Sequence, residues 1–346
     1  MNLFPAVVDR ATGPWSPAGE GEPSANSAKL APALGWLASA GPKVRLTETG
    51  NAWLSEGWTA DPAVAWYAPG AEPGTADGYY RLELPDLENQ DRAGLSLVVR
   101  PSRRRAGLGT ELLGHAVREA AGAGRTVLSG YAARGSAGEA FAVSAGATFG
   151  KEDVRRQHDV RAIPAGLLDS LRATAEQAAA GYSLVRWAGS VPDDRLGQVA
   201  SVINALNDAP HDEGVEPDIW DAARVRDRWN NQFGHREYAV AAIHDATGDM
   251  AGIVQVIVHP QTPEWGGIAF TAVARQHRGH RLGLLVKVAI TEQLLAAEPD
   301  LRRIHTQNAA SNRHMIAVNE MLGYEVTGPP VVSAEVPVAG GTRSPA

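Results

Sequence analysis

The sequence predicts a mixed α/β protein built from two similar domains in tandem, and three observations support this prediction. The chain has 346 residues, which is more than one ordinary hydrophobic core holds. Residues 98–113 and 270–295 share one pattern, in which an apolar run meets a cluster of Arg, then a Leu-Gly pair and a helical periodicity. A short apolar strand, a second helix and a last strand follow each stretch, so one order of elements occurs twice.

The first copy follows an N-terminal arm. Residues 1–29 are rich in Pro, Gly and Ser and have no periodicity, so we expect a loosely ordered segment. Residues 68–78 combine Gly, Pro and Asp between two apolar runs, which predicts a hairpin loop. After the glycine turn, the pattern predicts a strand at residues 125–130, a small-residue helix at residues 136–147 and a closing strand at residues 154–163.

A helix is expected to link the two copies. Residues 164–181 begin with Pro, end with Gly and space their apolar residues at helical intervals, which predicts a capped helix. Residues 182–189 then open the second copy as a strand. We therefore expect an N-terminal domain at residues 1–163 and a C-terminal domain at residues 182–346.

The second copy repeats the elements of the first in the same order. Residues 267–273 predict the strand before the turn, and residues 302–308 predict the strand after the long helix. Residues 310–326 predict the last helix and the start of the last strand.

The composition excludes several classes of protein. The net charge of −7 argues against general nucleic-acid binding. The absence of Cys excludes disulfides, thiolate metal sites and a cysteine nucleophile. No apolar run approaches the roughly 18 residues of a membrane span, and the N-terminus lacks the basic start and apolar segment of a signal peptide. We therefore expect a cytoplasmic monomer or homodimer with no membrane partner.

The glycine turn at residues 104–109 allows two interpretations. A glycine-rich turn before a helix lets successive backbone N–H groups point at one phosphate, and the helix dipole adds to the attraction. A tight turn between a strand and a helix also uses Gly, only to relieve steric strain. The turn alone leaves both interpretations open.

The turn and its surroundings resemble the GCN5-related N-acetyltransferases (GNATs). That family binds acetyl-CoA through a loop of pattern Gln/Arg-x-x-Gly-x-Gly/Ala between its fourth strand and third helix. Arg104, Gly107 and Gly109 match this pattern in full. The resemblance covers residues 44–337 as two tandem copies. It implies two domains, each with a mainly antiparallel sheet that is flanked by helices and splits between its fourth and fifth strands.

The second copy matches the loop with one exception. Arg278 and Gly283 fit the pattern, but Arg281 stands where the middle Gly is expected. An Arg there loses about 1 kcal/mol of backbone freedom, and more if its φ is positive, although its guanidinium could itself meet a phosphate. The resemblance implies acetyl-CoA binding in both copies without a metal, at Val98, Val99, Arg104, Arg105, Ala106, Gly107, Leu108, Gly109, Thr110, Ala272, Val273, Arg278, Gly279, His280, Arg281, Leu282, Gly283, Asn308 and Asn312.

A later family motif runs Asn, then Tyr seven residues on, then Leu-Gly-Phe. The second copy keeps Asn312 and ends in Leu-Gly-Tyr, but it holds Asn319 at the Tyr position. The first copy holds Gly and Ala at the two positions. Asn312, Asn319 and Tyr324 are the candidate catalytic residues, although Asn319 cannot act as an acid and a residue at the position of Tyr324, where the family has Phe, more often packs.

Acetyl transfer to an amine needs a base, because only the neutral amine attacks the thioester. Family members often place a carboxylate on or near the fourth strand, but residues 94–99 and 267–273 carry none. Asp91, Glu264 and His259 are the nearest candidates, and each is also compatible with a surface loop. Water molecules could remove the proton instead, and a thiol leaves without a strong acid.

One acidic segment is the candidate acceptor site. Residues 204–220 follow the first helix of the second copy, a region that lines the acceptor side in this family. Clustered carboxylates attract an ammonium group, although a solvated acidic loop has the same composition. Asn308 could bond pantetheine or the acceptor, or cap the next helix. The candidate acceptor residues are Asp208, His211, Asp212, Glu213 and Glu216.

The sequence thus predicts an acetyltransferase that moves the acetyl group of acetyl-CoA to a primary amine of a small molecule. The later motif and the acidic segment favour chemistry in the second copy, with the first copy as a structural or CoA-holding partner. A non-catalytic acyl-CoA-binding or regulatory protein and a peptide or protein N-acetyltransferase remain alternatives.

Overall fold

The computed structural model describes residues 4–5, 57–58, 61–71, 76–230, 235–258, 260 and 262–338. Apart from residues 4–5, the expected N-terminal arm (residues 1–29) lies outside them, as does the candidate base His259. Within the described residues, no helix is long and apolar enough to cross a bilayer.

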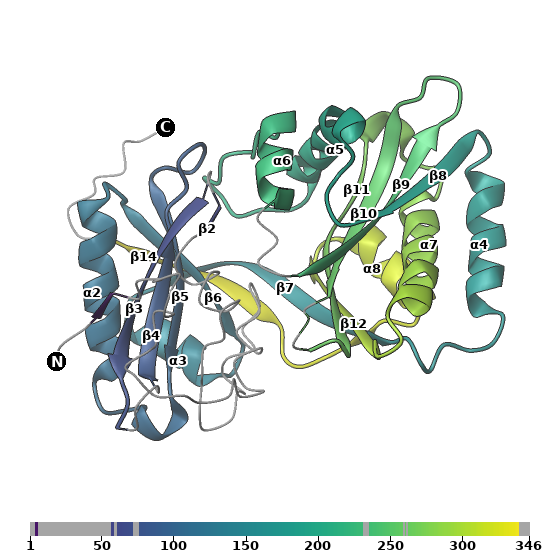
Figure 1. Ribbon diagram of the computed structural model, residues 1–346. Helices are drawn as coiled ribbons and strands as arrows, with labels where there is room; N and C mark the ends of the chain where they lie inside the picture. The colour runs from purple at the N-terminus through teal and green to yellow at the C-terminus, as the bar shows by residue number, and fades with distance from the viewer. Residues whose placement is uncertain are drawn as a thin grey trace. The chain divides into compact units, whose positions relative to one another are not determined.

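The chain forms two compact units (Figure 1). Unit 1 comprises residues 1–150, 213–216 and 331–346, and unit 2 comprises residues 151–212 and 217–330. Each unit holds a mainly antiparallel sheet with helices packed on it, so the predicted α/β fold class is confirmed.

In unit 1 the strand order is β1-β3-β4-β5-β6-β14, with β2 beside β3. Among these pairs, β5 and β6 run parallel and the others antiparallel. The expected hairpin loop joins β3 to β4, which is confirmed by their antiparallel pairing. Helix α2 packs its buried stripe of Leu and Ala on β4 and β5, and α3 packs on β6. The elements are β1 (Phe4–Pro5), β2 (Gly57–Trp58), β3 (Asp61–Pro69), β4 (Ala76–Glu83), β5 (Arg92–Val99), η3 (Pro101–Arg103), α2 (Leu108–Gly122), β6 (Val127–Ala133), α3 (Ala137–Ser144) and β14 (Val331–Pro337).

In unit 2 the strand order is β7-β12-β11-β10-β9-β8, with β13 beside β7. Here β11 and β12 form the parallel pair. The elements are β7 (Thr148–Asp159), α4 (Leu167–Ala178), β8 (Tyr182–Ala188), η4 (Asp193–Arg195), α5 (Leu196–Ile203), η5 (Asn204–Asp208), α6 (Ala222–Asn230), β9 (Arg236–His244), β10 (Met250–Val258), β11 (Trp265–Val273), η6 (Arg275–His277), α7 (Leu282–Ala297), β12 (Arg303–Ala309), α8 (Arg313–Met321) and β13 (Glu325–Val326). Helix α4 lies within the expected linker at residues 164–181 and packs on α7.

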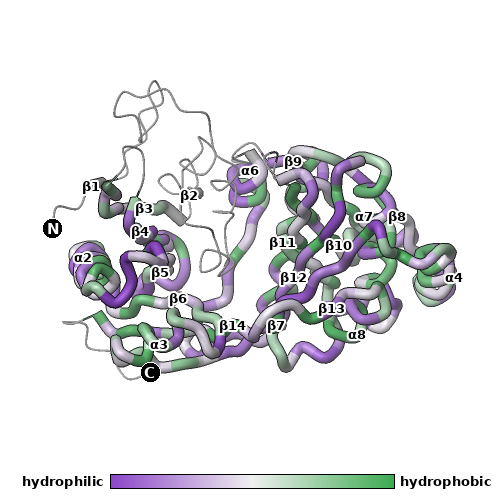
Figure 2. Tube along the Cα trace, turned by 90° about the horizontal axis from the view of Figure 1, so that it is seen from below, coloured by the Kyte–Doolittle hydropathy of each residue, from purple (hydrophilic) through white to green (hydrophobic). Residues whose placement is uncertain are grey.

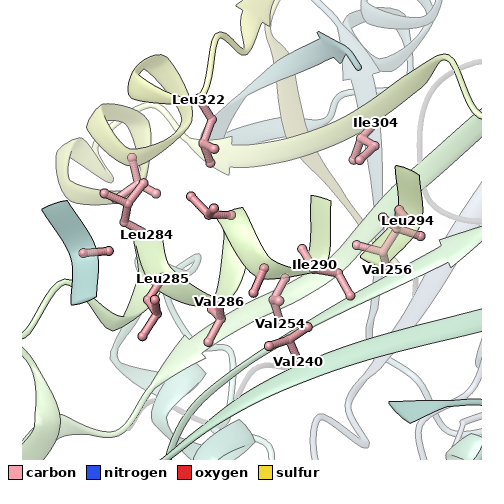
Figure 3. Packing of buried hydrophobic residues seen from close by; sticks show 14 of the residues in the cluster. Val240, Val254, Val256, Leu284, Leu285, Val286, Ile290, Leu294, Ile304 and Leu322 are labelled. Atoms are coloured by element: carbon pink, nitrogen blue, oxygen red, sulfur yellow. The ribbon is translucent and has the colours of Figure 1, made fainter. Parts of the chain in front are cut away.

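The core of unit 2 lies on both faces of its sheet. Helix α7 is apolar on nearly all sides and packs on Val240, Val254 and Val256 of the strands (Figure 3). Helices α5 and α6 cover the opposite face, where Ala239 and Ile253 lie. Because both faces are covered, β9 and β10 are apolar along almost their whole length rather than alternating.

The last strands of the two copies do not follow the contiguous boundaries that the sequence predicts. Residues 153–159 of β7, expected to close the first domain, pair with β12 in unit 2. Strand β14, expected to close the second domain, pairs with β6 in unit 1. A strand pattern shows which side chains face a core but not which sheet receives them, so the sequence does not reveal this exchange. Figure 2 shows that β7 is largely hydrophilic, and its Arg156 and His158 are nevertheless buried.

Candidate active site

The two glycine turns have the same backbone conformation. In unit 1 the left-handed residues are Arg105, with a φ of 63°, and Gly107, with a φ of 86°. In unit 2 they are Gly279, with a φ of 88°, and Arg281, with a φ of 53°. These are the same two positions of the loop, counted from the Arg that begins each motif. Each copy therefore places Gly at one left-handed position and Arg at the other.

This arrangement explains the departure of the second copy from the family pattern. Arg281 does adopt a positive φ, so it carries the left-handed cost of about 1 kcal/mol or more. Arg105 carries the same cost in the first copy, which matches the family pattern in full. The substitution at the middle Gly therefore changes which position is strained, not the shape of the turn.

The turns offer free backbone donors at the start of a long helix. Within the described chain, the N–H groups of residues 105–110 and 279–283 donate to no acceptor. Some of these N–H groups belong to the first turn of α2 or α7, where a helix has no carbonyl of its own to accept from them. These donors and the helix dipole suit a pyrophosphate. The predicted loop residues Ala106, Leu108, Gly109, Thr110, His280, Leu282 and Gly283 all lie in these two segments.

The first Arg of each motif braces the end of the preceding strand. Arg104 Nε donates to the carbonyl oxygen of Val99 at 3.1 Å, and Arg278 Nε donates to that of Val273 at 3.3 Å. Both side chains therefore fix the angle at which the strand enters the turn.

Both sheets splay beside the turn. In unit 1, β5 pairs with β6 only over residues 92–94, and in unit 2, β11 pairs with β12 only over residues 265–267. The predicted cofactor residues Val98, Val99, Ala272 and Val273 lie on the splayed halves. Backbone groups on this half have no strand on one side, so they are available to an extended ligand such as pantetheine.

Of the two splayed strands β5 and β11, both fully described, β11 alone carries a bulge. Gln255 lies opposite Phe270 and Val256 lies opposite Ile268, so Ala269 is an extra residue with no partner on β10. Ala269 also lies beyond the last residue paired with β12. The corresponding register of β4 with β5 is unbroken. A bulge next to a site typically re-aims backbone groups.

The later motif forms a buried polar chain. Asn319, with 0% of its surface exposed, donates to Asn308 Oδ1 at 2.7 Å and accepts a hydrogen bond from Lys287 Nζ. Asn308 lies on β12 at its splayed end. Asn312 is the N-cap of α8, where its side chain accepts from the backbone N–H of Met315 at 3.2 Å. The structure thus brings Asn308 and Asn319 together and gives Asn312 a capping role.

Tyr324 lies under the same chain. Its ring faces Lys287 Nζ at 4.7 Å and lies 4.8 Å from the ring of His158. Burial raises the pKa of Tyr324 and lowers the pKa of Lys287 to about 7. Burial, with Lys287 nearby, lowers the pKa of His158 to about 4. This environment gives Tyr324 a packing role and makes it a poor proton donor at neutral pH.

The structure places Asp208 beside the cofactor turn. Its carboxylate forms ion pairs with Arg275 and with Arg278, the latter at 2.7 Å. The hydrogen bonds from Arg275 and then Arg278 lower the pKa of Asp208. Asp208 therefore couples the predicted acceptor segment to the first Arg of the turn.

The other predicted acceptor residues hold the segment in place. Asp212 accepts from the backbone N–H of Lys151, and His211 bonds the carbonyl oxygen of Ala209 at 3.0 Å. Within unit 1, Glu216 exchanges hydrogen bonds with Asn89, and the carbonyl oxygens of Glu213 and Gly214 accept from Arg92. These contacts are the kind that order a loop.

The sequence did not single out Glu237, a buried carboxyl group. It lies on β9, on the face that α5 and α6 cover, and accepts a hydrogen bond from Gln255 Nε2. Burial raises the pKa of Glu237 to about 7, against the lowering effect of Arg228 at 3.8 Å. The other candidates are less suited, since Asp91 pairs with the neighbouring Arg92 at an exposed strand end. A carboxylate inside the apolar run of β9 is the signal that was available in the sequence.

Comparisons with known proteins agree with this geometry. The model of the acetyltransferase (GNAT) family matches residues 34–133. The chain is similar to the solved structure of a tandem GNAT protein from the clavulanic acid biosynthesis pathway, with 27% identity over 99% of both chains and a TM-score of 0.73. It is also similar to a GCN5-related N-acetyltransferase from Sphaerobacter thermophilus, with 17% identity over 81% of this chain and 82% of that one and a TM-score of 0.54, which shows a shared fold. No curated protein matches the chain.

The paired splayed sheets and phosphate-type turns define a protein with two GNAT folds. The family match over residues 34–133 and the full-length likeness to a tandem GNAT protein are consistent with a tandem member of the GCN5-related N-acetyltransferases. Acetyl-CoA is the cosubstrate of that family, and the free N–H groups of both turns fit its pyrophosphate.

Proposed function

We propose that the chain transfers the acetyl group of acetyl-CoA to a primary amine of a small molecule, and that the chemistry takes place in unit 2. The bulge at Ala269 carries this proposal. The thioester carbonyl gains negative charge during attack and needs a fixed N–H donor. Ala269, which has no register partner on β10, lies at the apex of the splay, between the turn and the paired end of β11.

Unit 1 is proposed to hold acetyl-CoA without turning it over. Its turn keeps the conformation that suits a pyrophosphate, but β5 has no bulge and no backbone group is re-aimed at the splay. A small-molecule acceptor is supported by the full-length likeness to a protein from a small-molecule biosynthesis pathway.

The first experiment measures CoA release from acetyl-CoA in the presence of a panel of small amines, with a thiol reagent. The chain has no Cys, so the protein gives no thiol background. We expect release with at least one amine. Binding of acetyl-CoA without release for any amine would favour a non-catalytic acyl-CoA-binding protein.

The second experiment deletes Ala269, which removes the extra residue and gives β11 the register of β5. We expect kcat to fall about 100-fold or more, the effect of losing one oxyanion donor, while acetyl-CoA still binds in calorimetry. Ala269→Gly keeps the extra residue and serves as the control, with kcat within a few-fold of wild type. A deletion variant with unchanged kcat would contradict the assignment to the bulge.

A further inference from the structure

We propose that Glu237 is the general base of the transfer and that the acceptor amine binds beside it, on the face of the unit 2 sheet that α5 and α6 cover. This inference rests on the proposed function in unit 2. It adds the residue that takes the proton, the face from which the amine approaches and a test for each.

The strand registers place Glu237 next to the proposed reaction point. Gln255 on β10 lies opposite Phe270, the residue that follows the bulge at Ala269. Glu237 lies opposite Ile257, two residues along β10, and therefore on the same face as Gln255. The turn and the carboxyl group thus lie on opposite sides of the bulge along β11. A thioester that extends from the turn toward the bulge meets an amine held near Glu237.

One carboxylate oxygen of the buried Glu237 has no hydrogen bond among the described residues. Only 2% of its surface is exposed, and Oε2 accepts the hydrogen bond from Gln255. Within the described residues, Oε1 has no hydrogen bond, and its nearest cation is Arg228 Nη1 at 3.8 Å. A buried carboxylate oxygen without a hydrogen bond is costly, so this atom is suited to meet a donor from a ligand.

Two aromatic side chains lie on the same face of the sheet as the carboxyl group. Trp229, which follows Arg228 on α6, is 2% exposed, and its ring meets Phe270 edge to face with centroids 6.0 Å apart. Its indole Nε1 also has no hydrogen-bond partner among the described residues. The face therefore offers one acceptor for an ammonium group, one donor for an oxygen and a flat apolar surface. A small primary amine with an apolar body and a hydrogen-bond acceptor fits this set.

Unit 1 lacks these groups at the matching positions. Arg81 of unit 1 occupies the position of Gln255. Arg81 pairs with Ser96 on β5 and with Ala65 on β3. Gln255 likewise pairs with Phe270 on β11 and with Ala239 on β9. Two residues before Ala65 on β3 is Ala63, which takes the place of Glu237. Unit 1 instead has Glu83 on β4, opposite Ala63, and its side chain is 43% exposed and paired with Arg81. A buried carboxyl group with an amide partner at these positions therefore occurs in the copy that has the bulge.

The proton affinity of Glu237 suits a base at neutral pH. Burial raises its pKa to about 7, and Arg228 on α6 and the hydrogen bond from Gln255 on β10 both lower it. The neighbouring strands contribute aromatic residues to this face, Trp187 from β8 and Phe270 from β11.

The steps balance as follows. The Glu237 carboxylate takes one proton from the ammonium group, and the nitrogen lone pair then forms the C–N bond to the thioester carbon. The tetrahedral intermediate collapses with cleavage of the C–S bond, whose electron pair leaves on sulfur. The second proton of the attacking nitrogen goes to the thiolate, and Glu237 returns its proton to water.

The test compares the pH dependence of kcat/KM for wild type and Glu237→Gln with an amine that wild type accepts. We expect wild type to lose activity below an apparent pKa of about 7. Glu237→Gln should lower kcat 100-fold or more at pH 7.5 and remove this acid limb, with acetyl-CoA affinity unchanged. The matched control is Glu298→Gln, because Glu298 is also a buried carboxyl of unit 2 but pairs with Arg236 and Tyr238, which leaves the acid limb in place.

A second variant keeps the test independent of folding. Gln255→Leu removes the hydrogen bond that favours the charged form of Glu237, so the acid limb should move to higher pH while kcat at pH 9 stays near that of wild type. An unchanged limb in Gln255→Leu, or full activity in Glu237→Gln, would overturn the proposal while leaving acetyl transfer intact. If wild type releases no CoA with any amine, the proposed function itself fails, and this inference fails with it.

Discussion

Lys287 is expected to destabilise the folded protein at neutral and acidic pH. It lies on the apolar helix α7 with 1% of its surface exposed, and its ammonium group meets only Asn319 and the ring of Tyr324 among the contacts of the described chain. Burial lowers its pKa from 10.5 to about 7. Replacement by Met keeps much of the volume and removes the charge.

The magnitude follows from proton linkage. A pKa that falls from 10.5 to about 7 corresponds to about 5 kcal/mol of lost stability below pH 7, where both states carry the proton. Between these two values the unfolded chain binds the proton and the folded chain does not, so stability rises with pH. About 3 kcal/mol of the penalty disappears between pH 6 and pH 9. Met also loses the hydrogen bond and the ring contact, about 2 kcal/mol together.

The assay is urea unfolding of wild type and Lys287→Met at pH 6 and pH 9. We expect the variant to be more stable by about 3 kcal/mol at pH 6 and by little or nothing at pH 9. Lys151→Met is the control, because Lys151 lies 3.2 Å from Asp153 in an ion pair and its removal should give no gain at either pH. A stability difference that does not change with pH would mean that the folded protein keeps Lys287 protonated, and the reasoning would be refuted.

Two further predictions concern cofactor binding. Gly107→Val forces a β-branched residue into a left-handed position, so calorimetry should detect one fewer CoA per chain or a CoA affinity at least 10-fold lower at one site; unchanged binding would make the turn purely structural. Asp208→Asn releases Arg275 and Arg278, so it should change the Kd of acetyl-CoA several-fold at low salt and leave the amine KM unchanged. The reverse result would place Asp208 in the acceptor site, as the sequence suggested.

The sequence predicted those features that depend on local patterns. Both turns, the hairpin between β3 and β4 and the splay of each sheet follow from glycine spacing and from the family resemblance. The bulge is a single extra residue, Ala269, within the nine residues of β11. No local signal in the sequence distinguishes this residue from the others of the strand. It becomes visible only when β10 supplies the register.

The candidate site was predicted less well, because its chemistry depends on partners that are distant in the sequence. Asp208 looked free for an amine, but its two Arg partners follow about 70 residues later. In the sequence, Glu237 is a single acidic residue in an apolar strand. In the fold it is buried and accepts a hydrogen bond from Gln255. A pKa near 7 results from that burial, which the residue type alone cannot indicate.

The two turns also bear on the question that the glycine pattern left open. If the turns only changed the chain direction, a conformation without a left-handed Arg would be less costly, by about 1 kcal/mol in each copy. Yet Arg105 and Arg281 both hold positive φ values, and the strain falls at different positions of the loop. The backbone conformation that the two turns share presents a row of N–H donors in front of a helix. A pyrophosphate that accepted from these donors would stabilise the strained form, so under the proposed function both copies should bind CoA, including the copy without the bulge and the buried carboxyl group.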